Sequence, residues 1–280
     1  MAVIASLLIS SKKASAQAFA ATCTNYVQSQ VYDGFSSIQY DENATFLGSD
    51  CYYSWPYNYI YQSLPFNFIF DSTSYSAGSS VYVHQNGALS FTYTGNYDYG
   101  NAISGTNQGS FPNYINAWGF VYYPYSCGSN EYSEVSGSVG SRIWTLEFDN
   151  VGTYYSGYTV SIQIKLYEGT NAVEFLYSGN GQYVGYGYTG GIGMNGTKSG
   201  DYNAFQKQAN QFQYSGAIYT PSSNILFSPP QITNIQLSAQ PKTLNFGTIQ
   251  AGTGISSAPQ CVTVQNVGTF GILNIASAII

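Results

Sequence analysis

Apolar and polar residues alternate along most of this chain with the two-residue period that is typical of β-strands. Between residues 64 and 91, Phe66, Phe68 and Phe70 recur at every second position, so we expect them to fill one buried face. Further along this stretch, the pair Asn86-Gly87 divides two apolar runs and favours a type I′ hairpin turn. The pattern predicts three core strands here.

Similar alternation recurs through residues 17–227. Expected strands lie at residues 117–121, 142–148, 160–167 and 173–177. No stretch repeats the i, i+3, i+4 spacing with capping residues that predicts a helix. We therefore predict an all-β fold in which residues 17–227 form a jelly-roll-like β-sandwich.

A domain boundary is indicated at residues 228–231, because the pair Pro229-Pro230 disfavours a strand interior and favours an extended linker. Alternation returns in residues 232–280, which predicts a second β-sandwich. The forty residues from Pro241 onward hold fewer than half of the ~100 that an immunoglobulin-like sandwich needs. We therefore expect an incomplete domain, or a chain that continues past Ile280.

Residues 1–16 support two interpretations. The first is a signal peptide cleaved near Ala16 or Ala18, where small residues follow an apolar run. The second is a β-strand with one apolar face. That face would consist of Val3, Ala5, Leu7 and Ile9.

Composition excludes several functional classes. Only 7% of the 280 residues are charged, while Tyr and Gly occur 29 and 30 times. Seven basic residues are too few for the positive stripe that binds nucleic acid. No apolar run reaches the ~20 residues of a membrane-spanning helix. We expect a secreted protein with a surface that is polar through hydroxyl and amide groups.

The cysteine and histidine content favours disulfides over a metal site. There is one histidine and no C-x-x-C pair, which is too little for most zinc sites. Disulfides in an oxidising compartment fit better, with the connectivity left open. The candidates are Cys23, Cys51, Cys127 and Cys261.

No residue stands out as catalytic, and no cofactor or metal is expected. His84 could belong to a catalytic triad, but the sequence has no Gly-x-Ser-x-Gly turn, which marks the nucleophile of a serine hydrolase. Glu147 and Asp149 share a strand face and could act as paired carboxylates on a glycoside, but their pattern favours ordinary strand positions. Glu174 is expected to be solvated. We therefore predict that the protein is not an enzyme.

Several polar segments could bind a metal ion or carry a glycan. The acidic turns at residues 41–43 and 130–134 could supply oxygen ligands to Ca²⁺, although their spacing favours ordinary turns. Asn43 and Asn195 begin N-x-Thr glycosylation triplets, and both are expected to be accessible.

Aromatic residues cluster before the first core strand. Their near-alternation would expose several rings on one face, as a sugar-binding platform does, although tyrosines also pack across sheets and subunit contacts. The platform candidates are Tyr53, Trp55, Tyr57 and Tyr59.

Two parts of the chain resemble known families. The segments "LPFNFIFDSTSY", "VYVHQNGALSF", "RIWTLEFDNV" and "VSIQIKLYEGTNAVEFLY" resemble a β-sandwich module of large secreted bacterial surface proteins. Residues 241–280, with "LNFGTIQAGTGISSAPQCVTVQNVG", are similar to the opening of immunoglobulin-like repeats of the ASH/choice-of-anchor type. The first resemblance implies an extracellular, non-catalytic domain, and the second concerns fold only.

The two ends of the chain suggest how it could assemble. An N-terminal strand donated to the incomplete C-terminal domain of a neighbour would generate a filament, an assembly that resembles donor-strand extracellular filament subunits. Leu273 and Ile275 are the C-terminal candidates for that contact. Our first prediction is thus a structural filament subunit whose partners are copies of itself. The alternative is a carbohydrate-binding or adhesion module with glycan partners.

Overall fold

The computed structural model describes residues 22–50, 59–84, 87–93, 112–118, 129–152, 159–188, 191–198, 200–206, 214–230, 237–240 and 263–266. These residues form β-strands and a single 3-10 turn, η1 (Cys23–Asn25), which confirms the all-β prediction. The chain divides into two compact units. One is Ala20–Pro230, and the other comprises Met1–Phe19 with Gln231–Ile280.

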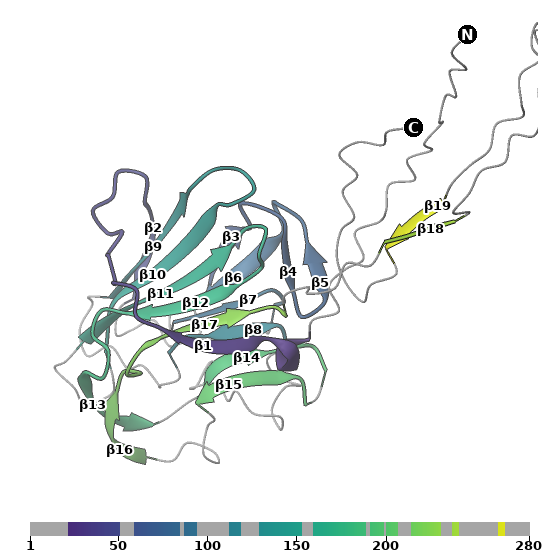
Figure 1. Cartoon of the computed structure of the whole chain (residues 1–280). Coiled ribbons are helices and arrows are strands. Elements are labelled where there is room, and N and C mark those ends of the chain that lie inside the picture. Colours follow the sequence, from purple (N-terminus) through teal and green to yellow (C-terminus); the bar gives the residue numbers. More distant parts are fainter. Residues whose placement is uncertain are drawn as a thin grey trace, which may run out of the picture. The chain divides into compact units, whose positions relative to one another are not determined.

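The larger unit contains a seven-stranded antiparallel sheet (Figure 1). Its order is β1 (Val27–Val31), β17 (Asn224–Ser228), β12 (Val173–Tyr177), β11 (Thr159–Tyr167), β10 (Ile143–Gly152), β9 (Ser129–Ser136) and β2 (Thr45–Asp50). The first and last strands in this order lie far apart in space but only fourteen residues apart in sequence, from Val31 to Thr45. A short connection between β1 and β2 therefore joins the two opposite edges of the sheet.

A six-stranded sheet forms the second layer of the same unit. Its order is β15 (Tyr202–Gln206), β14 (Ile192–Asn195), β8 (Tyr114–Asn116), β7 (Ala88–Ser90), β6 (Ser80–His84) and β3 (Tyr59–Ser63). Two two-stranded sheets accompany these: the hairpin of β4 (Phe68–Phe70) and β5 (Thr73–Tyr75), and the pair of β13 (Tyr183–Tyr188) and β16 (Tyr214–Tyr219). Together the sheets form a β-sandwich.

The alternating apolar residues fill the core as predicted. Phe66, Phe68 and Phe70 are fully buried, as are Val81 and Val83. Burying each such side chain contributes about 1.5–3 kcal/mol. The core is also joined by polar contacts: the Tyr177 hydroxyl of the larger sheet donates to Ala117 O, which follows β8, at 2.8 Å.

Several predicted strands are confirmed, with shifted boundaries. Strands β11 and β12 match the expected residues 160–167 and 173–177. Strand β8 (Tyr114–Asn116) ends where the strand expected at residues 117–121 was to begin. Gly87 has φ +85° and β6 pairs with β7 across the predicted hairpin turn, while Asn86 itself lies outside the described residues.

The smaller unit is described only at β18 (Leu237–Gln240) and β19 (Thr263–Asn266), which pair antiparallel. The immunoglobulin-like domain therefore stays a prediction, and so do the two alternatives for residues 1–16. The assembly-strand candidates Val3, Ala5, Leu7, Ile9, Leu273 and Ile275 all lie outside the described residues. The described part of the chain has no helix long and apolar enough to cross a membrane.

Candidate functional site

Four tyrosines gather at one edge of the six-stranded sheet, and we call Tyr59, Tyr61, Tyr82 and Tyr93 the tyrosine face. The ring centroid of Tyr59 lies 5.1 Å from that of Tyr61, 5.5 Å from Tyr82 and 5.4 Å from Tyr93. All three contacts are edge-to-face, the arrangement that aromatic quadrupoles favour. Tyr61 and Tyr93 keep 59% and 58% of their surface exposed, so the face is open to a partner.

The strand register creates this face. Tyr61 lies opposite Tyr82, and Tyr59 opposite His84, on paired strands β3 and β6. Because side chains alternate across a strand, Val81 and Val83 of β6 point to the other side, where both are fully buried. The same alternation that builds the core therefore aligns the tyrosines on the outside.

The hydroxyl groups of the tyrosine face also interact. The Tyr61 hydroxyl lies 3.3 Å from that of Tyr59. Hydrogen bonds to Tyr61 and then to Tyr93 raise the pKa of Tyr59 above its ordinary value, which keeps the phenol protonated. The face thus combines exposed rings with neutral hydroxyl donors and acceptors, the combination that stacks on and hydrogen-bonds to a sugar.

The structure describes only one of the four predicted platform residues. Tyr59 lies in the tyrosine face, whereas Tyr53, Trp55 and Tyr57 lie outside the described residues. Sequence reasoning missed Tyr82 and Tyr93 as platform members. Tyr82 could have been found from its position on the outer side of a strand next to His84, but Tyr93 follows β7 and carries no such signal.

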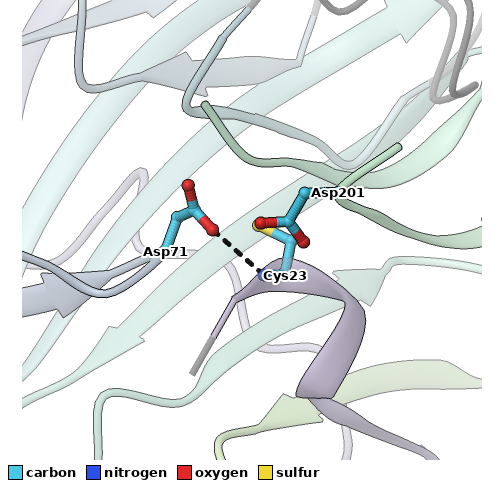
Figure 2. A group of neighbouring side chains, drawn as sticks. All are labelled: Cys23, Asp71 and Asp201. Carbon is cyan, nitrogen blue, oxygen red and sulfur yellow. Dashed lines mark hydrogen bonds between the residues drawn. The ribbon is translucent and has the colours of Figure 1, made fainter. Parts of the chain in front are cut away.

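A second cluster joins three distant segments, and we call Asp71 and Asp201 the acid pair. Figure 2 shows Asp71, Asp201 and Cys23 lying together. A ligand atom from each lies within 4.8 Å of the others, and all three residues are buried. A methyl group on Gly196 would lie 2.6 Å from Asp71 Oδ1 and 2.7 Å from Asp201 Oδ2. A glycine is therefore required for this close approach.

Hydrogen bonds occupy much of the acid pair. Asp71 accepts from the backbone N of Cys23 at 3.2 Å, and from the backbone N and hydroxyl of Thr197 at 2.7 and 2.6 Å. Asp201 Oδ1 accepts from the backbone N and hydroxyl of Thr24 at 2.8 and 2.9 Å. These bonds tie η1 and the turn after β14 to the hairpin of β4 and β5.

That hairpin turn is unusual. Asp71 and Ser72 have φ values of 47° and 62°, a region that residues other than glycine rarely adopt. Strain of this kind costs on the order of 1 kcal/mol per residue and persists only where surrounding contacts hold it. The bonds to the Asp71 carboxylate supply those contacts.

The two carboxyl groups titrate in opposite directions. Burial raises the pKa of Asp201, and so do its hydrogen bond to Asp71 and the Asp71 charge. Burial alone would also raise the pKa of Asp71, but its hydrogen bonds with Asp201, Thr197 and Cys23 outweigh burial and lower it. As the pH falls, Asp201 is therefore protonated before Asp71.

The third member of this cluster is the Cys23 thiol. Burial, followed by the charges of Asp71 and Asp201, raises the pKa of Cys23 well above its ordinary value. The thiol thus stays protonated and unreactive. Cys23 is a free thiol in the structure. Cys51, Cys127 and Cys261 lie outside the described residues, so the disulfides stay a prediction.

His84 contacts a serine but offers no open reaction centre. His84 Nε2 lies 2.8 Å from Ser90 Oγ. The two residues are 5% and 0% exposed, so a substrate cannot reach this hydroxyl without rearrangement. The contact links β6 to β7 beneath the tyrosine face, where the His84 and Tyr59 rings lie 6.2 Å apart.

Two carboxylates of the larger sheet, Glu147 and Asp149, accept several hydrogen bonds. Glu147 is fully buried and accepts from Ser37 Oγ at 2.5 Å, Ile38 N at 2.7 Å and Gln163 Nε2 at 2.7 Å. Asp149 accepts from Asn150 Nδ2 at 2.7 Å and Ser161 Oγ at 2.6 Å. Both carboxylates therefore link neighbouring chain segments through hydrogen bonds.

Glu174 corrects another expectation. It is only 2% exposed and accepts from the Tyr167 hydroxyl, so the prediction that it is solvated is wrong. Burial raises its pKa. The alternation of β12 was interpreted as one buried face, whereas all five residues of this strand are buried.

Only one of the two acidic segments is a turn, because residues 130–134 lie in strand β9. Asp41 accepts from the backbone N and side chain of Asn43 at 2.9 and 3.1 Å, which closes a local turn. Burial and then the charge of Asp41 raise the pKa of Glu134, while Lys165 opposes that shift. Lys165 therefore offsets part of the negative charge near Glu134.

The two glycosylation triplets differ. Asn43 is exposed as expected, but Asn195 is 0% exposed, so the expected accessibility of Asn195 is wrong. Asn195 lies in β14, and the Thr197 hydroxyl of its triplet donates to Asp71. Pairing of β14 with β8 and β15 therefore accompanies the burial of Asn195, while Thr197 stays exposed.

Most of the chain matches a known protein family. Residues 25–237 match the family described as NIDO related, and the chain therefore belongs to that family. No curated protein and no solved structure matches the chain. The family is typical of extracellular proteins and points to an adhesion-type module.

Proposed function

We propose that the Ala20–Pro230 unit of this NIDO-related chain binds glycans at the cell surface through the tyrosine face. The observation that carries this proposal is a set of touching rings with exposed hydroxyls, of which Tyr61 and Tyr93 are more than half exposed. Sugar rings stack on such faces, and their hydroxyl groups pair with phenols. In this proposal the module binds without catalysing a reaction.

The test is glycan-array binding by the full chain, followed by calorimetry on any ligand found. We expect Tyr61→Ala and Tyr93→Ala each to weaken binding by roughly tenfold, as for the loss of one stacked ring worth about 1–1.5 kcal/mol. Tyr40→Ala is the matched control, because Tyr40 is 90% exposed but lies outside the tyrosine face. A blank array, or equal losses with the control, would refute the proposal.

A second candidate function is a filament that polymerises by strand exchange between residues 1–9 and the C-terminal region of a neighbour. Its support is the alternation of apolar residues at positions 3, 5, 7 and 9, which is typical of a strand with one apolar face that another chain can bind. Deleting Ala2–Ile9 should then abolish polymers seen by electron microscopy while the sandwich stays folded. Intact fibres after the deletion would exclude strand exchange.

A further inference from the structure

Strand β1 is an exposed edge. Among the described residues it pairs with β17 on one side only and is the last strand of its sheet (Figure 1). Residues 27–30 are exposed, with Val27 at 59%. Natural edge strands usually carry charges, prolines or bulges that prevent pairing with another chain. Strand β1 has none of these, because its residues are Val-Gln-Ser-Gln-Val in unbroken register with β17.

The sequence of this edge is the same in both directions. Residues 26–32 are Tyr-Val-Gln-Ser-Gln-Val-Tyr, a palindrome centred on Ser29. An antiparallel pair of such strands with a twofold axis at Ser29 places Val27 opposite Val31 of a second copy and Gln28 opposite Gln30. Like residues therefore meet at all five positions of β1, residues 27–31, and cross-strand pairs of this kind stabilise a sheet.

We propose that β1 pairs antiparallel with β1 of a second copy of this chain, about a twofold axis at Ser29. The contact joins two seven-stranded sheets into one continuous sheet and is self-complementary, as a twofold interface requires. It is independent of the tyrosine face, so it goes beyond the proposed function. Because only one short strand from each copy takes part, the interface is small and the association weak, which suits chains crowded on a surface.

The register gives a charge test. In Gln28→Lys/Gln30→Lys, a lysine faces a lysine at two places, and we expect the dimer dissociation constant to rise roughly tenfold or more. In Gln28→Lys/Gln30→Glu, each lysine instead faces a glutamate, and we expect dimerisation to return. Sedimentation equilibrium of the full chain measures both, and circular dichroism verifies that each variant is folded.

A crosslink tests the axis directly. Antiparallel partners lie 4.5–5.5 Å apart between Cα atoms, within the range that a disulfide spans, so Ser29→Cys should give covalent dimers under mild oxidation. Gln30→Cys is the matched control, because its counterpart in the second copy lies two residues off, at roughly 8 Å. Unsubstituted protein provides the background from its own cysteines.

Each outcome decides the proposal. Concentration-dependent dimers that the lysine pair weakens and the lysine–glutamate pair restores, with crosslinking at position 29 only, support it. A chain that stays monomeric at its highest soluble concentration overturns it. Equal dimerisation of the two charged variants, or equal crosslinking at positions 29 and 30, also overturns it, because either result is incompatible with this register.

Discussion

The acid pair and the tyrosine face are both polar clusters, but they are built in opposite ways. Asp71 and Asp201 are 5% and 7% exposed, and backbone and hydroxyl donors from two other segments bind them. Tyr61 and Tyr93 are more than half exposed and interact mainly with other members of their own face. A buried, bonded cluster stabilises the fold, whereas an exposed one is available for binding.

The largest expected effect comes from removing the centre of the buried cluster. Asp71→Ala leaves the Cys23 and Thr197 donors without their acceptor and should lower the free energy of unfolding by about 3 kcal/mol. Urea unfolding measures this change. The control is Asp41→Ala, whose exposed carboxylate serves a local turn and should cost less than about 1 kcal/mol. Equal losses in the two variants would contradict the comparison.

A smaller effect is expected in the pH dependence of stability. The raised pKa of Asp201 means that the folded state holds a proton that the unfolded chain releases above the ordinary aspartate pKa of about 3.9. Its contribution is complete below that pH and is lost as pH rises through the folded pKa. The lowered pKa of Asp71 acts oppositely, and its contribution is lost as pH falls below about 3.9.

Asp201→Asn separates the two titrations. The amide can still donate to Asp71 and accept from Thr24 but does not titrate, so the loss of stability with rising pH should become shallower. The loss at low pH, which comes from Asp71, should remain. The free energy of unfolding measured from pH 3 to 8 follows both losses of stability. If the loss at rising pH is the same in Asp201→Asn as in the unsubstituted protein, the raised pKa of Asp201 is not its cause.

The smallest effect on stability should come from the tyrosine face. Tyr61→Ala removes an exposed ring and should change the free energy of unfolding by less than about 0.5 kcal/mol, although glycan binding weakens. Thermal unfolding beside the binding assay measures both properties. A loss of stability as large as that of Asp71→Ala would mean that the tyrosines serve the fold, as the acid pair does.

Much of the sandwich follows from local patterns. Val160, Ile162, Ile164 and Leu166 alternate in the sequence and are buried in β11, because a strand sends successive side chains to opposite faces. The interpretation of β12 failed at Glu174 because alternation reveals one buried face but does not show whether other chain segments cover the second.

The candidate sites were less accessible to sequence reasoning. Asp71 and Asp201 are 130 residues apart, and no local pattern links them. Asn195 resembled an accessible acceptor because its triplet is a local signal, whereas its burial accompanies the pairing of β14 with two other strands. Tyr59 was found through a cluster of neighbours in the sequence, but its ring contacts with Tyr82 and Tyr93 required strands to be paired.

The sequence by itself determined the β architecture, the inner faces of the strands and the turn at Gly87, since periodicity and backbone preferences act over a few residues. Only the tertiary structure decided which polar groups are buried and link chain segments by hydrogen bonds, and which lie on an exposed surface. The reason is physical: the exposure, pKa and hydrogen bonding of a side chain depend on the segments folded against it. Those segments come from distant parts of this chain.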